Sequence, residues 1–174
     1  IKSRNFPIVA FYDISKGLTF LEPEMEREFN KITSNVAKGL MHAMPSKLFY
    51  YIDMALKDTK MALFIDHAEK IIPSGDVASM SIEERMALIW ICEWSNSSKI
   101  SSVGSTIFLM ANSLAEINNE VLKSAYRVEP ILVELPAEEA RMEYIQYLLK
   151  DESVRMDISI SDFAKLSSGL SKKA

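Results

Sequence analysis

An apolar run that ends in an acidic residue is the first feature with chemical meaning in this sequence of 174 residues. The run is Met61 to Ile65, M-A-L-F-I, and Asp66 follows it. A continuous apolar run without alternation is typical of a strand buried on both faces in a parallel sheet. A carboxylate at the end of such a strand is placed to hold a magnesium ion. We therefore expect Asp66 to bind magnesium, although a strand also ends in Asp simply because a loop begins there.

The turn after an earlier apolar run, Pro7 to Asp13, lies where a phosphate-binding loop would belong. A Walker A loop needs the pattern G-x-x-x-x-G-K-[ST], because its amides wrap phosphates at the start of a helix. No two of the five glycines have that spacing, so the Walker A loop is absent. The remaining candidates for contacts with a nucleotide cofactor are Asp13, Ser15, Lys16 and Gly17.

Two further polar residues are candidates for a role in catalysis. Asn112 follows the apolar run Thr106 to Met110, and an amide there can orient a water against a terminal phosphate. Arg127 can reach a phosphate bound by a neighbouring subunit, as an arginine finger does. The plainer alternatives are that asparagine favours strand ends and turns, and that a surface arginine is solvated.

Histidine, serine and cysteine chemistry receives less support. His67 lies between Asp66 and Glu69, but two carboxylates and one histidine within four residues rarely ligate one zinc ion. The sequence has no G-x-S-x-G motif for a nucleophilic serine. The single cysteine, Cys92, excludes an internal disulfide and indicates a reducing compartment.

Apolar runs alternate with amphipathic segments along the chain. This order predicts the α/β class, a three-layer α/β/α core with a mainly parallel sheet. The expected strands cover residues 7–13, 61–65, 106–110 and 131–135. The expected helices cover residues 22–43, 46–57, 81–94, 115–124, 136–150 and 159–170, with a surface loop at 95–102.

Composition excludes several classes of protein. With 48% apolar and 25% charged residues the chain has enough apolar side chains for a folded core. A net charge of −4 argues against a nucleic-acid-binding surface. No apolar run reaches the roughly 18 residues that span a bilayer. The chain begins with Ile1 and shows no signal peptide, so we expect a piece of a longer cytoplasmic protein.

Five segments in this order and spacing resemble a module of the AAA+ ATPases, whose core has the P-loop NTPase fold. Ser81 followed by Glu84 is a capping-box pattern, which predicts the start of the helix that holds the second segment. The last two segments resemble the entry into a helical lid and one of its helices. The segments are F-I-D-H-A-E-K-I-I-P (64–73), E-R-M-A-L-I-W (84–90), I-F-L-M-A-N-S-L-A-E-I-N (107–118), V-E-L-P-A-E-E-A-R (133–141) and D-F-A-K-L-S-S-G-L-S (162–171).

The resemblance implies an AAA-like core over residues 1–135 and a truncated helical lid over 136–174. Asp66 would match the magnesium-side Asp of Walker B, Asn112 the sensor-1 residue, and Arg127 loosely the arginine finger. The chain departs from the family pattern because Walker A is missing, because His67 stands where the catalytic Glu belongs, and because one expected strand precedes Asp66 instead of two.

These departures imply a P-loop-less, non-hydrolysing regulatory or assembly module of an ATP-driven protein remodeller. ATP and magnesium would then be cofactors of the parent protein, and this segment itself would need none. Its partners would be a downstream ATPase module and neighbouring subunits. Two alternatives stay open: an ATP-hydrolysing domain with an unusual phosphate loop near Ser15 to Gly17, and a plain α/β protein-interaction domain.

Overall fold

The computed structural model of the chain describes residues 6–123, 127–150 and 157–169. The chain forms two compact units, Ile1–Glu129 and Pro130–Ala174, which we describe separately. The first holds the sheet and most of the helices, and the second holds the helices α6 (Glu138–Leu148) and α7 (Ile160–Leu166). Among the helices of the described residues, none has the length and hydropathy needed to cross a lipid bilayer.

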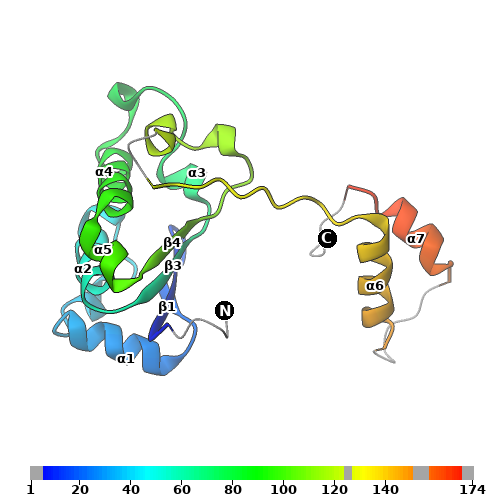
Figure 1. Ribbon diagram of the computed structural model, residues 1–174, viewed down its shortest axis with the longest axis horizontal. Helices are drawn as coiled ribbons and strands as arrows, with labels where there is room; N and C mark the ends of the chain where they lie inside the picture. The colour runs from blue at the N-terminus through cyan, green and yellow to red at the C-terminus, as the bar shows by residue number, and fades with distance from the viewer. Residues whose placement is uncertain (1–5, 124–126, 151–156, 170–174) are drawn as a thin grey trace. The chain divides into compact units, whose positions relative to one another are not determined.

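A four-stranded sheet organises the first unit (Figure 1). The central strands β1 and β3 pair in parallel, as do β3 and β4, whereas β2 pairs with β1 in an antiparallel hairpin. The strand order is β2-β1-β3-β4. This arrangement confirms the predicted α/β class with a mainly parallel sheet. The strands are β1 (Ile8–Asp13), β2 (Gly17–Phe20), β3 (Met61–Ile65) and β4 (Thr106–Leu109).

The two faces of the sheet differ in burial. On one face Tyr12 and Ile65 are register partners, and both are almost completely buried. On the other face Phe11, Phe64 and Phe108 stack across three strands, with ring centroids 5.1 and 4.6 Å apart. Phe108, on the edge strand β4, remains 38% exposed. The fully buried core therefore lies on the first face.

Helices α2, α4 and α5 lie together on one side of the sheet (Figure 1). Helix α2 begins at a proline, which suits the first turn because that position needs no amide hydrogen bond. Its buried Phe49 contacts the rings of Tyr12 in β1 and Trp94 in α4. The helices of this unit are α1 (Pro23–Ile32), α2 (Pro45–Asp58), α3 (Ala68–Ile71), α4 (Ile82–Asn96) and α5 (Ser98–Val103).

Three predicted segments differ from the structure for local reasons. The helix expected over residues 22–43 ends at Ile32, because Ser34 and Asn35 take left-handed backbone conformations with φ of 53° and 61°. The loop expected at 95–102 contains helix α5, since the Ser97 side chain caps it by accepting from the amide of Ile100. The helix expected at 115–124 is replaced by 3₁₀ turns at Leu114–Glu116 and Asn119–Leu122, and residue 124 lies outside the described residues.

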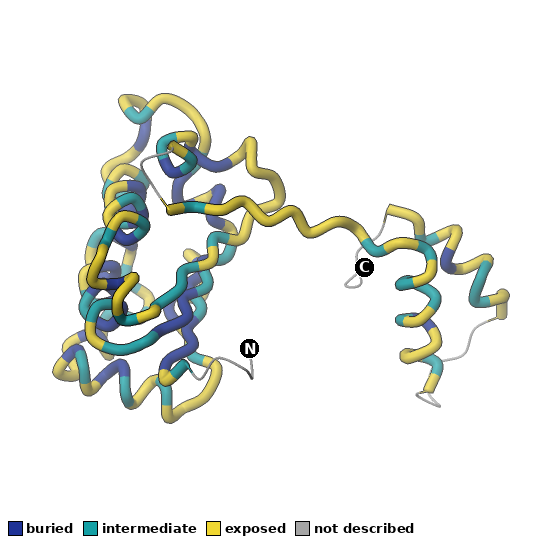
Figure 2. Tube along the Cα trace, in the orientation of Figure 1, coloured by how far each residue is buried: buried dark blue, intermediate teal, exposed yellow. Residues whose placement is uncertain are grey.

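The strand expected at residues 131–135 does not form. The segment is extended but has no strand partner among the described residues, and it is exposed along its length (Figure 2). Ile131, Leu132 and Val133 are 77%, 84% and 87% exposed. An apolar run predicts a strand only where a neighbouring strand supplies hydrogen bonds and a face to cover it.

The predicted capping box at the start of α4 is confirmed. The Ser81 hydroxyl accepts from the amide of Glu84, and the Glu84 carboxylate accepts from the amide of Ser81 at 2.7 Å. Two hydrogen bonds lower the pKa of Glu84 below its ordinary value. The larger effect comes from the side chain of Ser81 and the smaller from its backbone amide. A carboxylate with a lowered pKa stabilises the fold above its unfolded pKa of about 4.3, and this contribution is lost as the pH falls through the folded pKa.

Replacing Ser81 with alanine should therefore lower the free energy of unfolding by about 1 kcal/mol at pH 7. The deficit should shrink as the pH falls below about 4.3, since the wild-type protein loses its own capping interaction there. Urea denaturation at pH 7 and pH 3.5 measures both effects. Ser98→Ala is the matched control, because Ser98 is exposed at the start of α5 and is not its cap. A deficit that grows on acidification would contradict the role given to Glu84.

Candidate functional site

The carboxyl ends of β1 and β3 bring two predicted site residues together. Asp13 ends β1, and Asp66 follows β3, which lies next to β1 in parallel register. The amide of Asp66 donates to the carbonyl of Tyr12 at 2.9 Å, so the pairing of the strands continues to this point. One side-chain ligand atom each from Asp13, Asp66 and His67 lies within 4.8 Å of the other two. We call these three residues the strand-end cluster.

The turn between β1 and β2 holds the Asp13 carboxylate in place. Its Oδ1 accepts from the amide of Ser15 at 2.7 Å, from the hydroxyl of Ser15 and from the amide of Lys16 at 3.2 Å. The Ser15 hydroxyl is the main cause that keeps the pKa of Asp13 below its ordinary value. Asp13 is thus an oriented carboxylate with its second oxygen, Oδ2, free of these contacts.

Gly17 serves the packing of this hairpin. It has a φ of 75°, and a β-carbon added there would lie 2.1 Å from the carbonyl oxygen of Met41. The next amide, of Leu18, donates to that same oxygen at 2.7 Å. The turn therefore closes against the segment around Met41 and leads into a strand, whereas a phosphate loop leads into a helix.

The residues of this turn do not fit the phosphates of ATP. A phosphate-binding loop offers several free amides, but the amides of Ser15 and Lys16 already donate to Asp13. The carboxylate they surround would also repel a phosphate. The predicted contacts of Asp13, Ser15, Lys16 and Gly17 with a nucleotide stay predictions, and this geometry disfavours them.

Asp66 and His67 form the other half of the strand-end cluster. Asp66 accepts from the amide of His67 through Oδ1 at 2.9 Å, and its side chain is partly exposed. His67 has left-handed backbone angles, φ 51° and ψ 44°, and its side chain is 55% exposed. With one oxygen of each aspartate unused by these contacts, the cluster fits a divalent cation. Asp66 thus lies beside two other possible metal ligands, and its predicted binding of magnesium stays a prediction.

Glu69 lies directly behind the cluster. The residue is 4% exposed, and neither carboxylate oxygen has a hydrogen-bond donor among the described residues. Its Oε1 lies 3.5 Å from the Nδ1 of His67. The sequence places Glu69 near Asp66 but gives no sign of its burial, because the short helix α3 that turns it inward was not predicted.

The electrostatic environment near the cluster is negative. Burial raises the pKa of Tyr12 to about 12, and the carboxylates of Glu83 and Asp13 add to the rise. Tyr12 is the residue before Asp13 and is 1% exposed. Only the smaller part of this rise, which comes from the two carboxylates, has the sign that favours a cation.

The other two predicted site residues, Asn112 and Arg127, lie in segments that follow β4 and are not among the three residues of the cluster. Asn112 is exposed in the segment after β4, and the amide of Ala68 donates to Met110 nearby. The Arg127 guanidinium donates to the hydroxyl of Ser101 in α5 at 3.2 Å. Their predicted roles against a phosphate, the second of them in a neighbouring subunit, stay predictions.

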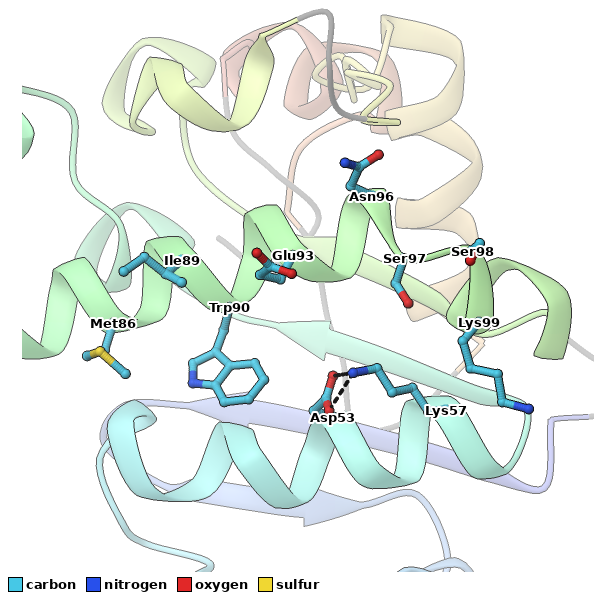
Figure 3. Close-up of a pocket in the computed structure, with 10 residues that line it drawn as sticks. All are labelled: Asp53, Lys57, Met86, Ile89, Trp90, Glu93, Asn96, Ser97, Ser98 and Lys99. Atoms are coloured by element: carbon cyan, nitrogen blue, oxygen red, sulfur yellow. Dashed lines mark hydrogen bonds and ion pairs between the residues drawn. The ribbon is translucent and has the colours of Figure 1, made fainter.

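A groove of about 580 Å³ opens elsewhere, between α2, α4 and α5 (Figure 3). Asp53 and Lys57 form an ion pair at 2.8 Å on its floor, and Trp90 and Ile89 line it from α4. None of its lining residues belongs to the predicted site. Asp53 is neutralised by Lys57, and the other charged residues of the lining are Glu93 and Lys99.

A protein family model matches most of the chain. The family model described as AAA+ chaperone, N-terminal Rossmann-like domain, matches residues 1–134. Among curated proteins no relative matches the chain. The matched range covers all four strands of the sheet, together with the strand-end cluster.

Proposed function

Because the chain belongs to the family of AAA+ chaperone N-terminal Rossmann-like domains, we propose that it is a non-hydrolysing regulatory or assembly module of an ATP-driven protein remodeller. The observation that carries this proposal is the closed hairpin after β1. At the position where an active module binds phosphates, the amides of the turn donate to Asp13.

The module lacks the main groups that ATP hydrolysis requires, namely those that hold the phosphates and position the attacking water. Phosphoryl transfer depends on amides and a lysine that hold the phosphates, and on a base or polar group that positions water. Here Lys16 lies on an exposed hairpin turn, and the residue after Asp66 is His67 in place of a glutamate. A retained Asp66 and Asn112 cannot replace the missing phosphate cradle.

ATP and magnesium would then be bound by a downstream ATPase module of the same protein. Neighbouring subunits of a ring would be the other partners, and Arg127 would meet them if it acts as an arginine finger. A cytoplasmic location, and the absence of nucleic-acid and membrane partners, belong to the same proposal. The net charge of −4 and the single cysteine support them.

Calorimetric titration of the chain with ATP and magnesium tests the proposal. We expect no saturable heat, no rise in melting temperature, and the same result for Asp66→Asn. Saturable binding that Asp66→Asn abolishes would contradict a non-hydrolysing module.

A pair of lysine variants distinguishes our proposal from the competing hypothesis, in which the chain binds ATP through an unusual phosphate loop. That hypothesis requires ATP binding that is lost in Lys16→Ala and kept in Lys38→Ala, a second exposed lysine outside the hairpin. Our proposal expects the wild-type chain and both variants to give the same absence of binding.

A further inference from the structure

A buried carboxylate without a donor requires an explanation. Glu69 is removed from water, and its only neighbour at ion-pair distance among the described residues is His67. Burying a carboxylate is costly unless a donor or a positive charge compensates it. An imidazole supplies that compensation when its nearer nitrogen carries a proton toward the carboxylate and its other nitrogen binds a cation.

The same imidazole belongs to the strand-end cluster. Asp13 and Asp66 come from neighbouring strands 53 positions apart in the sequence, a separation that follows from their residue numbers. Each has one oxygen held by backbone amides and one oxygen outside those bonds. The ligand atoms of the two aspartates and His67 lie within 4.8 Å of one another, which brings three donors from two strand ends to one place.

We propose that Asp13, Asp66 and the Nε2 of His67 bind a zinc ion, with Glu69 as the buried carboxylate that orients His67 through Nδ1. This site needs no nucleotide, so it goes beyond the proposed regulatory or assembly role. Its formation would tie the ends of β1 and β3 together and stabilise the sheet at the edge where a nucleotide site would lie.

The donor set selects the metal. Two carboxylate oxygens and one imidazole nitrogen suit zinc, which takes three protein ligands and a water in open sites. Magnesium prefers six oxygen ligands and keeps its waters, so an imidazole contributes little to its binding. Ligand atoms around tetrahedral zinc are about 3.3 Å apart, so binding draws the cluster slightly closer. The exposed turn at His67 can provide that movement.

Titration of the tag-free chain with zinc chloride, without nucleotide, tests this site. We expect one zinc ion per chain, a rise in melting temperature on zinc addition, and much weaker binding of magnesium. His67→Asn and Asp66→Asn should each weaken zinc binding by more than about tenfold, and Glu69→Gln by about tenfold, as loss of an orienting carboxylate does. Asparagine is chosen for position 67 because it tolerates left-handed backbone angles.

Asp58→Asn is the matched control for Asp66→Asn, since Asp58 is an exposed aspartate at the end of α2. It should bind zinc as the wild-type chain does. Circular dichroism without zinc shows whether each variant folds, and Glu69→Gln, which keeps all three ligands, remains a test if a ligand variant does not. No saturable zinc binding, or binding that His67→Asn and Glu69→Gln leave unchanged, would overturn the site. Neither result bears on ATP binding, which the separate ATP titration decides.

Discussion

Replacing Gly17 with alanine is expected to lower the free energy of unfolding by about 3 kcal/mol. Two effects add at this position. The backbone φ of 75° lies in the left-handed region, which costs a residue with a β-carbon roughly 1–2 kcal/mol. The new β-carbon would also lie 2.1 Å from the carbonyl oxygen of Met41, and relief of such overpacking costs roughly 1–3 kcal/mol. Urea denaturation followed by circular dichroism measures the loss.

Two other glycines separate these effects. Gly104 has a φ of 83°, but its nearest neighbours are Lys60 side-chain atoms at 3.8 Å, so Gly104→Ala should cost only about 1 kcal/mol. Gly39 has open space around it and no positive φ, so Gly39→Ala should change stability by less than about 0.5 kcal/mol. A Gly17→Ala variant as stable as Gly39→Ala would mean that the hairpin does not close against Met41.

The same series bears on the function of the turn. If Gly17 served the close approach of the backbone to phosphates, its replacement by alanine would weaken nucleotide binding and leave the fold largely intact. If Gly17 serves packing against Met41, its replacement by alanine lowers the stability of the fold. We expect the second pattern, which agrees with a hairpin that closes against the segment around Met41.

The central part of the sheet could be predicted because its strands are continuous apolar runs. Met61 to Ile65 and Pro7 to Asp13 carry that signal in their own residues, and both strands form as expected. The hairpin strand β2, Gly17–Phe20, gave no comparable signal, since Gly17 and Thr19 interrupt its apolar residues. It forms because the chain turns at Asp13 and pairs back along β1.

The segment at residues 131–135 shows why an apolar run is not sufficient. Its residues resemble those of β3, but a strand is defined by its hydrogen-bonded neighbours, and the described residues provide none for it. The early end of α1 is a different case. Ser34 and Asn35 interrupt an otherwise regular amphipathic pattern, and the periodicity of the apolar residues does not report backbone angles.

The candidate site could be predicted residue by residue but not as a group. The sequence singles out Asp66 for its place after a strand and Asp13 for its place in a turn, with separate expected roles. Only the parallel pairing of β1 and β3 makes them neighbours. The sequence disfavours a zinc site made by residues 66–69 alone, because ligands so close together in the chain rarely bind one ion. That argument does not apply to a site that includes Asp13, which comes from another strand.

Replacing Phe49 with alanine is expected to lower the free energy of unfolding by about 4 kcal/mol, because a fully buried ring leaves a cavity that the core cannot fill. Phe49 joins the sheet to its covering helices. Its ring lies 5.2 Å from that of Tyr12 in β1 and 5.0 Å from that of Trp94 in α4. Since the whole fold of such a domain is stable by roughly 5–15 kcal/mol, this loss should be visible in both urea and thermal denaturation.

Tyr50→Ala is the matched control on the same helix, because Tyr50 is 54% exposed and its removal should cost less than about 1 kcal/mol.

The two variants also test how the core supports the site. Tyr12 precedes Asp13, so a ring that loses its contact with Phe49 leaves the end of β1 less firmly held. Phe49→Ala should then weaken zinc binding relative to Tyr50→Ala at a temperature where both are folded. Equal zinc binding by the two variants would mean that the hairpin turn alone positions Asp13, through its hydrogen bonds from Ser15 and Lys16.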